Sequence, residues 1–301
     1  MNDNRPKVWW VQCKPFDDIV NEKAEIEAFQ SKCKTELLFG IGWKESGLDI
    51  PAKSEMNQDT MERLRKRINN PAFTHAQRLF GKISQGDVIF TRLNDKYYVG
   101  VVKRLPLFSS DERLTWDSKV ESWVEIKDLP HHVRGKISSR KYQGTIAEVD
   151  GLSALTLIEN AGISCEKMTI GADDFFEAID DGDLEDLMAF YMTQQNPDFV
   201  FLPSSCKKNT PGIEYVMYDP KTNEKITCQT KVLDWIDVSV YSDDERYGKY
   251  KKIYLFAGNG YKGTPEDLKN IEIVDSTDLY DALKRNKYIR EIVEKSFELD
   301  E

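Results

Sequence analysis

The sequence lacks long apolar runs and is poor in the residues that hold zinc or form disulfides. No segment approaches the roughly 20 apolar residues that cross a bilayer. The first residues, MNDNRPK, also lack the apolar core of a signal peptide. We therefore expect a cytoplasmic protein without a membrane partner. The five cysteines stand singly, no CxxC pair exists, and a structural zinc site or disulfide framework has no support. We expect most of the cysteines to be small core residues.

The length and the distribution of charge indicate two domains. A chain of 301 residues is long for one hydrophobic core. Residues 1–165 contain 25 Lys and Arg against 23 Asp and Glu, whereas residues 166–301 contain 17 against 29. The net charge of -10 thus lies entirely in the second part. We predict a domain boundary near residue 165, with phosphate contacts more plausible in the first domain.

The first part has the pattern of a small, mostly β domain with helices. The clearest feature is GDVIFTRLNDKYYVGVVK at 86–103, where Asn94, Asp95 and Lys96 separate two apolar runs, as expected of a hairpin. The sequence predicts a β barrel or curled sheet covered by helices. The strands are expected at 7–13, 37–43, 86–103, 121–127 and 144–149, and the helices at 22–34, 59–68 and 71–82.

The second part alternates between helix and strand. A helix is expected over 172–195 with a break near Gly182, and a last helix begins at a cap on Ser276 or Thr277 and runs to about 297. This order predicts an α/β sandwich around a mixed sheet. The strands between the helices are expected at 198–202, 212–218, 225–232, 252–258 and 270–276.

A hairpin in the second part gathers three polar side chains. Asp-Pro and Thr-Asn turn residues separate two strand-like runs in PGIEYVMYDPKTNEKITCQTK at 211–231. Pairing Tyr218 with Lys225 sets Glu214 opposite Gln229 four residues further out. Directly paired residues project to one face of a sheet, and Lys231 lies two residues beyond Gln229. The register therefore predicts that Glu214, Gln229 and Lys231 lie together.

The preceding helix offers a second carboxylate. Its periodicity predicts that Glu185 lies at the edge of a buried stripe and that Asp186 points toward solvent. Glu185 is therefore the better candidate to face the sheet. The stripe consists of Leu184, Leu187, Met188 and Tyr191.

These four polar residues suit phosphodiester hydrolysis. The reaction needs a hard cation, an activated water and positive charge near the developing phosphorane. We expect Glu185 and Glu214 to hold Mg²⁺, with Mn²⁺ as an alternative, and Gln229 to add a weaker oxygen ligand. Lys231 would orient the water or stabilise negative charge in the transition state. The alternative is that a QxK sequence in a strand is only part of a solvated face.

Residues 180–260 resemble the PD-(D/E)xK nuclease superfamily, in particular its Mrr-like branch with a QxK motif. The residues that carry the resemblance are Glu185, Glu214, the segment Pro203-Ser204-Ser205 and Gln229-Thr230-Lys231. It implies a metal-dependent endonuclease fold with a catalytic set of Glu185, Glu214, Gln229 and Lys231. The sequence has Glu where many members have Asp, and Gln where the most familiar pattern has an acid. One charge fewer is therefore available for a metal.

Residues 8–150 resemble the PUA-like superfamily, particularly EVE domains, through LFGIGW at 38–43 and the hairpin at 84–105. In that group a curled barrel holds a flipped or modified base among aromatic rings. The candidates for base binding are Trp10, Trp43, Tyr97 and Trp116. The alternative is that these rings fill the core of a small barrel. The candidates for contacts to the nucleic-acid backbone are Arg92, Lys103, Arg104 and Arg140.

The sequence as a whole thus predicts a two-domain, restriction-type DNA endonuclease. Residues 1–165 would recognise a feature such as a modified base, and residues 166–301 would cut, a role that would suit defence against phage. Cutting both strands makes a homodimer plausible. Two alternatives stay open: a non-catalytic nucleic-acid-binding protein with a degenerate nuclease fold, and a nuclease directed at RNA.

Overall fold

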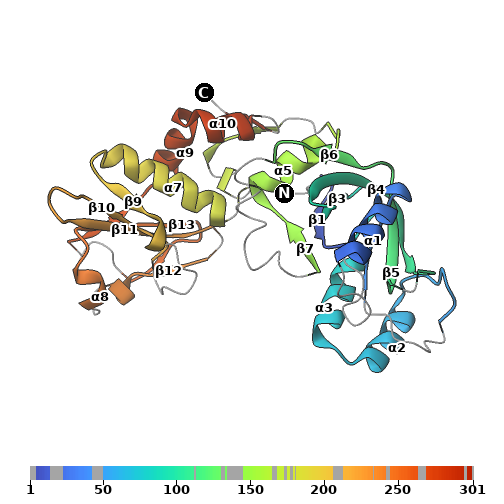
Figure 1. The fold of residues 1–301 in the computed structure, drawn as a ribbon. Helices are drawn as coiled ribbons and strands as arrows, with labels where there is room; N and C mark the ends of the chain where they lie inside the picture. Colours follow the sequence, from blue (N-terminus) through green and yellow to red (C-terminus); the bar gives the residue numbers. More distant parts are fainter. Residues whose placement is uncertain are drawn as a thin grey trace. The chain divides into compact units, whose positions relative to one another are not determined.

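The chain folds into two compact units, residues 1–165 and 166–301 (Figure 1). Both units combine helices with β-sheet, so the expected mixed α and β class is confirmed. The computed structural model describes residues 5–13, 23–42, 50–111, 113–129, 133, 145–164, 168–172, 175–176, 179, 181–205, 213–232, 234–241, 245–263, 269–294 and 297–299.

The N-terminal unit is built on one curved sheet, in which the strands follow the order β2-β5-β4-β3-β1-β7 and β6 pairs with β4. Within the described ranges no pairing joins β2 to β7, so the sheet is open and the expected barrel is not confirmed. The strands are β1 (Val8–Val11), β2 (Leu38–Ile41), β3 (Val88–Leu93), β4 (Lys96–Phe108), β5 (Trp116–Val120), β6 (Val124–Ile126) and β7 (Ile146–Val149).

The predicted hairpin at 86–103 is confirmed as β3 and β4. Leu93 pairs with Lys96 across a loop of Asn94 and Asp95. Both loop residues have positive φ angles, 48° and 63°. Asn and Asp tolerate this left-handed backbone, which matches the twist of the two strands.

Alternating side chains of this sheet enter two different cores. Trp9 and Val11 of β1 pack into the core formed with α1 (Lys23–Thr35), α2 (Gln58–Ile68) and α3 (Pro71–Phe80). Val8 and Trp10 enter the opposite core, which includes residues of α5 (Gly151–Asn160). The sheet is therefore covered on both faces, and the neighbouring residues Trp9 and Trp10 pack into different cores. The cysteines in the described ranges, at 13, 33 and 228, are free and buried, as expected of core residues.

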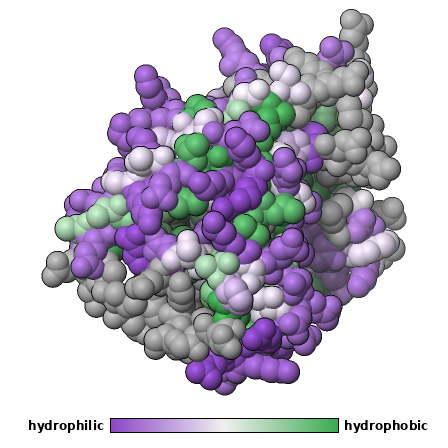
Figure 2. Space-filling model, turned by 90° about the vertical axis from the view of Figure 1, so that its right-hand side faces the viewer, coloured by the Kyte–Doolittle hydropathy of each residue, from purple (hydrophilic) through white to green (hydrophobic). Residues whose placement is uncertain are grey.

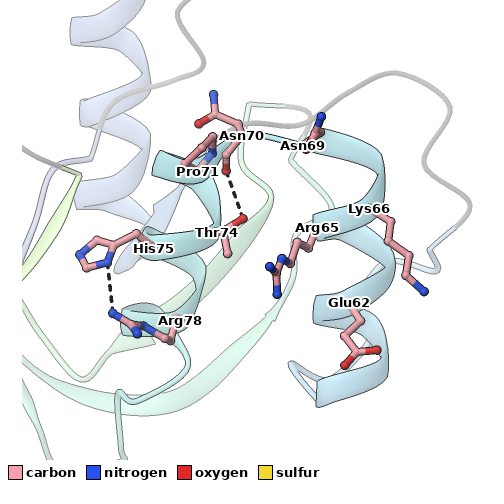
Figure 3. A pocket seen from close by; sticks show the side chains of 9 residues that line it. All are labelled: Glu62, Arg65, Lys66, Asn69, Asn70, Pro71, Thr74, His75 and Arg78. Atoms are coloured by element: carbon pink, nitrogen blue, oxygen red, sulfur yellow. Dashed lines mark hydrogen bonds between the residues drawn. The ribbon is translucent and has the colours of Figure 1, made fainter.

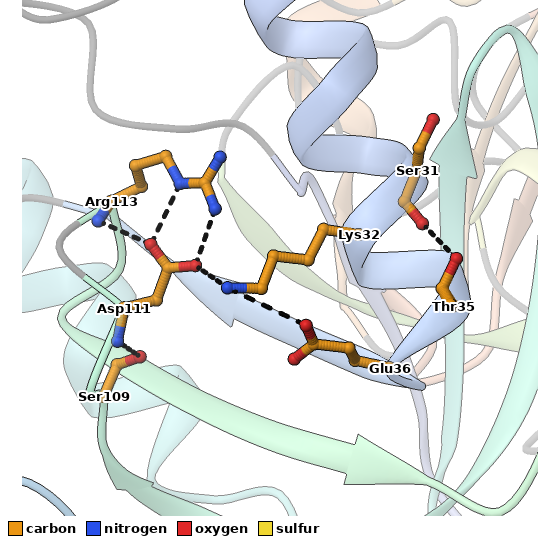
Figure 4. A network of polar contacts seen from close by, with 7 residues as sticks. All are labelled: Ser31, Lys32, Thr35, Glu36, Ser109, Asp111 and Arg113. Atoms are coloured by element: carbon orange, nitrogen blue, oxygen red, sulfur yellow. Dashed lines mark hydrogen bonds and ion pairs between the residues drawn. The ribbon is translucent and has the colours of Figure 1, made fainter.

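A buried ionic network fixes α1 to the loop after β4 (Figure 4). Asp111 accepts hydrogen bonds from the side chains of Lys32 (3.0 Å) and Arg113 (both 2.9 Å). Burial alone would raise the pKa of Asp111, but the hydrogen bonds from Arg113 and Lys32 outweigh it and hold this pKa well below its usual range. Because every charge here has a partner, we assign this network to the stability of the unit.

The surface seen in Figure 2 is mainly hydrophilic. Among the atoms drawn in colour, apolar side chains form small separate groups. This face therefore offers no broad apolar area to a partner.

The C-terminal unit contains a mixed sheet in the order β15-β13-β11-β10-β9. Strands β9, β10 and β11 are antiparallel, whereas β11, β13 and β15 are parallel. The mixed sheet was predicted, and α7 (Asp181–Gln195) lies along one of its faces (Figure 1). The strands are β9 (Val200–Leu202), β10 (Val216–Tyr218), β11 (Lys225–Lys231), β13 (Lys252–Ala257) and β15 (Ile271–Ile273).

The opposite face of this sheet packs against a second layer, which contributes Val238, Tyr241, Tyr247 and Tyr250 to a shared core. That layer includes the short strand β12 (Ile236–Asp237), the 3-10 helix η3 (Val238–Tyr241), α8 (Glu245–Gly248) and β14 (Tyr261–Lys262). A separate parallel pair joins β8 (Met168–Ile170) to β16 (Phe297–Leu299).

The last helix differs from its prediction in two respects. Its cap is Asp275, which accepts a hydrogen bond from the Thr277 backbone N–H, so neither Ser276 nor Thr277 is the cap. The helix is also divided into α9 (Ser276–Arg285) and α10 (Lys287–Val293). Asn286 between them has an extended backbone, and its side chain caps α10. Asn competes for backbone hydrogen bonds in this way at helix starts.

Candidate active site

The predicted hairpin register is present in the structure. Tyr218 pairs with Lys225, and Val216 pairs with Thr227. Beyond Val216 the ladder becomes irregular, because the Glu214 backbone N–H donates to the carbonyl oxygen of Cys228, at 2.9 Å. The register therefore slips locally before it reaches the expected partner of Glu214.

The side chains nevertheless meet as the register predicted. The amide nitrogen of Gln229 donates a hydrogen bond to Oε1 of Glu214. The Lys231 ammonium lies 4.0 Å from the same carboxylate oxygen. The Glu214 side chain is 18% exposed and the Lys231 side chain 38%. The hairpin therefore presents a carboxylate and a cation that solvent can reach, beside the buried amide of Gln229.

The helix α7 brings Glu185 to this group. The predicted stripe on α7 is buried, Glu185 is half-buried, and Asp186 is exposed. The hydroxyl of Tyr215, next to Glu214 in the chain, donates to the Glu185 carbonyl oxygen at 3.1 Å. This hydrogen bond links the helix to the strand entry and so sets the position of one carboxylate relative to the other.

The carboxyl groups of Glu185 and Glu214 are both partly buried and lie close enough to affect each other's pKa. Burial, reinforced by the nearby charge of Glu214, raises the pKa of Glu185 to about 7. Burial also raises the pKa of Glu214, although Lys231 opposes the rise and Glu185 forms a hydrogen bond with it. Both carboxyl groups therefore bind a proton more tightly than an ordinary glutamate does. Such crowding of carboxylates is common at functional sites.

Asp181 is a further acidic residue of the site that the sequence reasoning missed. Its charge raises the pKa of both Glu185 and Glu214. Its Oδ1 accepts a hydrogen bond from the Val232 backbone N–H at 3.1 Å. Asp181 precedes Glu185 by four residues, which places both on one helix face. That spacing was the available clue.

The donors present fit a hard cation only in part. Two carboxylates and the amide group of Gln229 meet here, with the amide nitrogen toward Glu214. Mg²⁺ commonly takes one or two protein carboxylates and completes its shell with water and substrate phosphates. Across the described residues, however, no cluster of three or more His, Cys, Asp or Glu side chains is placed to hold a metal. A metal at this position would therefore depend on Glu185, Glu214 and Gln229, with oxygen atoms from solvent or substrate.

A pocket of about 470 Å³ opens next to the hairpin, at the carboxyl ends of the parallel strands. Val232 and Gly258 line it, together with aromatic and aliphatic side chains. The Gly258 N–H donates to the Lys231 carbonyl at 2.9 Å. A Cβ atom at Gly258 would lie 2.0 Å from the Val232 carbonyl oxygen, so only glycine permits this approach. The pocket lies where open α/β sheets usually bind ligands.

Two of the aromatic candidates in the N-terminal unit lie together. The rings of Trp10 and Phe90 have centroids 5.3 Å apart, and Phe90 stacks on Tyr97 at 5.6 Å. Trp10 Nε1 is buried and finds no hydrogen-bond partner in the part of the chain that the structure describes. A buried donor without a partner is costly and therefore marks a position where a ligand acceptor would be favourable.

The other two candidates do not join this group. Trp116 is fully buried in the opposite core, where its indole N–H donates to Gln77 Oε1 at 3.1 Å. The structure therefore does not bring Trp116 together with Trp10, because the sheet separates the two rings. Trp43 lies outside the described residues.

The candidates for contacts to the nucleic-acid backbone differ in whether their charges already form ion pairs within the protein. Arg92 forms an ion pair with Asp95 at 2.6 Å, and Arg104 pairs closely with Asp117. Lys103 is exposed. Arg140 lies outside the described residues. Arg92 lies directly opposite Tyr97 in the β3–β4 ladder, so these two side chains project to the same face of the sheet.

Comparison with known proteins found no matching family model, no similar curated protein and no similar solved structure. Among the helices in the described ranges, none combines the length and apolar character that crossing a membrane requires. The geometry of the site is therefore the basis for proposing a function.

Proposed function

We propose that the C-terminal unit hydrolyses phosphodiester bonds of DNA in a metal-dependent reaction, as a restriction-type endonuclease with a PD-(D/E)xK-like sandwich fold. The observation that carries the proposal is the position of Glu214. Its carboxylate accepts a hydrogen bond from Gln229, lies 4.0 Å from the Lys231 ammonium and interacts with Glu185. A carboxylate pair can hold a divalent metal ion, and a cation beside it can stabilise negative charge in the transition state.

Each residue of the group has a distinct role in this proposal. Glu185, Glu214 and the Gln229 amide oxygen would hold Mg²⁺ or Mn²⁺, which supplies Lewis acidity and a more acidic water when bound. Lys231 faces the same position with its ammonium group and would stabilise negative charge as the phosphorane develops. Without a metal, a pKa of about 7 lets Glu185 exchange a proton near neutral pH, whereas a bound metal would require its deprotonated form.

The N-terminal unit would supply recognition. We infer that a PUA-like, EVE-like fold holds a modified base against the Trp10–Phe90–Tyr97 rings, with the Trp10 indole N–H donating to the base. A reader joined to a nuclease suits defence against phage DNA. Cutting both strands calls for two active sites and hence for a homodimer.

The rival function is a nucleic-acid-binding protein whose nuclease fold has lost activity. The observation in its favour is the small number of acids at the site, since no described cluster of three metal-binding side chains exists. A nuclease directed at RNA is the other alternative, because the chemistry of the four residues does not select the sugar.

A cleavage panel tests the proposal. Plain, methylated, hydroxymethylated and glucosylated DNA duplexes and an RNA duplex are incubated with Mg²⁺ or Mn²⁺ and resolved on denaturing gels. We expect metal-dependent DNA cleavage that Lys231→Ala and Glu214→Ala each reduce by about 100-fold or more. Lys225→Ala, at the exposed start of the same strand, is the matched control and should cleave normally. No cleavage of any substrate, or unchanged cleavage by both site variants, would contradict the proposal.

A further inference from the structure

A second polar site lies in the N-terminal unit, in the cleft between α2 and α3 (Figure 3). The cleft has a volume of about 900 Å³. Arg65 and Lys66 line it from α2, and His75 and Arg78 line it from α3. Figure 3 shows the Arg65 side chain between the two helices. The only acidic residue of its lining is Glu62.

The positive charge of this region stands out in an acidic chain. Residues 58–82 contain six Lys and Arg against two Asp and Glu, whereas the whole chain has a net charge of -10. The side chains of Arg65, Lys66 and Arg78 are exposed. None of the three forms an ion pair with a described residue, and Arg78 contacts only the ring nitrogen of His75, at 3.3 Å. Their charges are thus available to a ligand.

The two helices form a fixed frame for these charges. The side chain of Gln77 on α3 donates to the Met61 carbonyl on α2 at 3.0 Å, and its Oε1 accepts from Trp116. Asn57 caps α2, and Asn70 caps α3. The Asn70 side chain occupies the N–H groups of Ala72 and Phe73. Anion binding in the cleft therefore depends on the cationic side chains.

We propose that this cleft binds the phosphate backbone of a nucleic-acid duplex. Long exposed cations on two facing helices suit a polyanion that passes along an open cleft, since phosphate contacts supply most of the affinity for a duplex. This inference deepens the proposed function, on which its choice of nucleic acid as the ligand rests. It also assigns backbone contacts to residues other than Arg92 and Arg104, whose charges are already paired.

Binding of the full-length protein to labelled duplexes tests the proposal. Every protein carries Lys231→Ala, so that affinity is measured without cleavage. A 30-base-pair DNA duplex and an RNA duplex of the same sequence are titrated by fluorescence anisotropy at several salt concentrations. The test variant combines Arg65→Ala, Lys66→Ala and Arg78→Ala. All three side chains are exposed, and equal melting temperatures confirm that the variant folds.

The matched control also removes three positive charges from the N-terminal unit. It combines Lys7→Ala, Lys23→Ala and Lys96→Ala, each of which forms an ion pair, with Glu148, Glu27 and Glu125 respectively. We expect the cleft variant to bind at least one duplex about tenfold more weakly or worse at low salt. Its plot of log affinity against log salt should be shallower by about 2 to 3, since each lost phosphate contact accounts for about 0.9 on DNA. The control should change affinity by less than about twofold.

Glu62→Gln is a gain-of-function test in the same cleft. It removes the one acid of the lining and should tighten binding and steepen the salt dependence. The proposal is overturned if the cleft variant binds both duplexes as tightly as the control does. It is also overturned if polyglutamate competes with the duplex as well as unlabelled DNA does, because the cleft would then accept acidic protein segments.

The test separates this proposal from the proposed function. If the cleft variant loses binding and the wild-type protein cleaves no substrate in the cleavage panel, the cleft proposal is supported and the nuclease proposal is refuted. If the wild-type protein shows metal-dependent cleavage and the cleft variant binds normally, the nuclease proposal is supported and the cleft proposal is refuted.

Discussion

Replacing Glu185 by glutamine should stabilise the protein, and the gain should depend on pH. Burial and the Glu214 charge raise the pKa of Glu185 from the ordinary 4.5 to about 7. The folded protein therefore holds this proton more tightly than the unfolded chain does. The free energy of unfolding consequently falls as pH rises from about 4.5 to about 7 and stays reduced above that range. Glutamine resembles the protonated carboxyl group and carries no charge, so the variant should not lose stability as pH rises through this range.

The size of the effect follows from the pKa. At 1.36 kcal/mol per pH unit, a rise from 4.5 to about 7 sets an upper limit of about 3.4 kcal/mol. Glu185 is partly exposed and its titration depends on that of Glu214, so we expect about 1 to 2 kcal/mol. At pH 8, Glu185→Gln should be more stable than the wild type by this amount. At pH 5 the difference should be small.

Urea denaturation followed by circular dichroism at pH 5 and pH 8 measures both values without added metal. The control is Glu291→Gln, an exposed glutamate of α10 paired with Lys287, which should not change the pH dependence. Added Mg²⁺ should stabilise the wild type at pH 8 more than it stabilises Glu185→Gln, since a metal requires deprotonated ligands. A variant that is no more stable than the wild type at pH 8 would refute the assigned electrostatics.

Three further predictions concern other parts of the chain. Gly258→Ala should reduce the free energy of unfolding by about 1 to 3 kcal/mol, because the added Cβ atom overpacks the site. The same change should displace Lys231 and so impair cleavage. In the control Gly248→Ala the added Cβ atom meets no neighbour, so stability and cleavage should stay unchanged. Trp10→Phe should lower stability only modestly, because the cost of the space left in the core is partly offset by removal of a buried unpaired donor. It should abolish any preference for modified over plain duplexes in binding assays; an unchanged preference would exclude the indole as a base contact. Asp111→Asn should lower the free energy of unfolding at pH 7 by about 1 to 2 kcal/mol. Because the pKa of this carboxyl is held well below its usual range, the wild-type advantage should begin to shrink as pH falls below about 4 and should disappear only at the lower pKa of the folded state; an advantage that does not decline in acid would contradict this.

Local patterns in the sequence determined much of the candidate site. The turn between β10 and β11 set the register that joins Tyr218 to Lys225, and this pairing predicted the contact between Glu214 and Gln229. The helical period of α7 correctly separated half-buried Glu185 from exposed Asp186. Both predictions succeed because a hairpin and a helix are governed by residues close together in the chain.

Only the tertiary structure decided which distant groups meet. Asp181 enters the site because α7 packs on β11, and the carboxyl pKa values rise because this packing buries two acids together. Trp10 and Trp116 looked equivalent as exposed-pocket candidates, yet the sheet sends them into opposite cores. The basic cleft likewise arises from the packing of α2 against α3. Burial, charge coupling and the choice of sheet face all depend on contacts between segments far apart in sequence. A local sequence pattern cannot predict these contacts, because it reflects only residues close together in the chain.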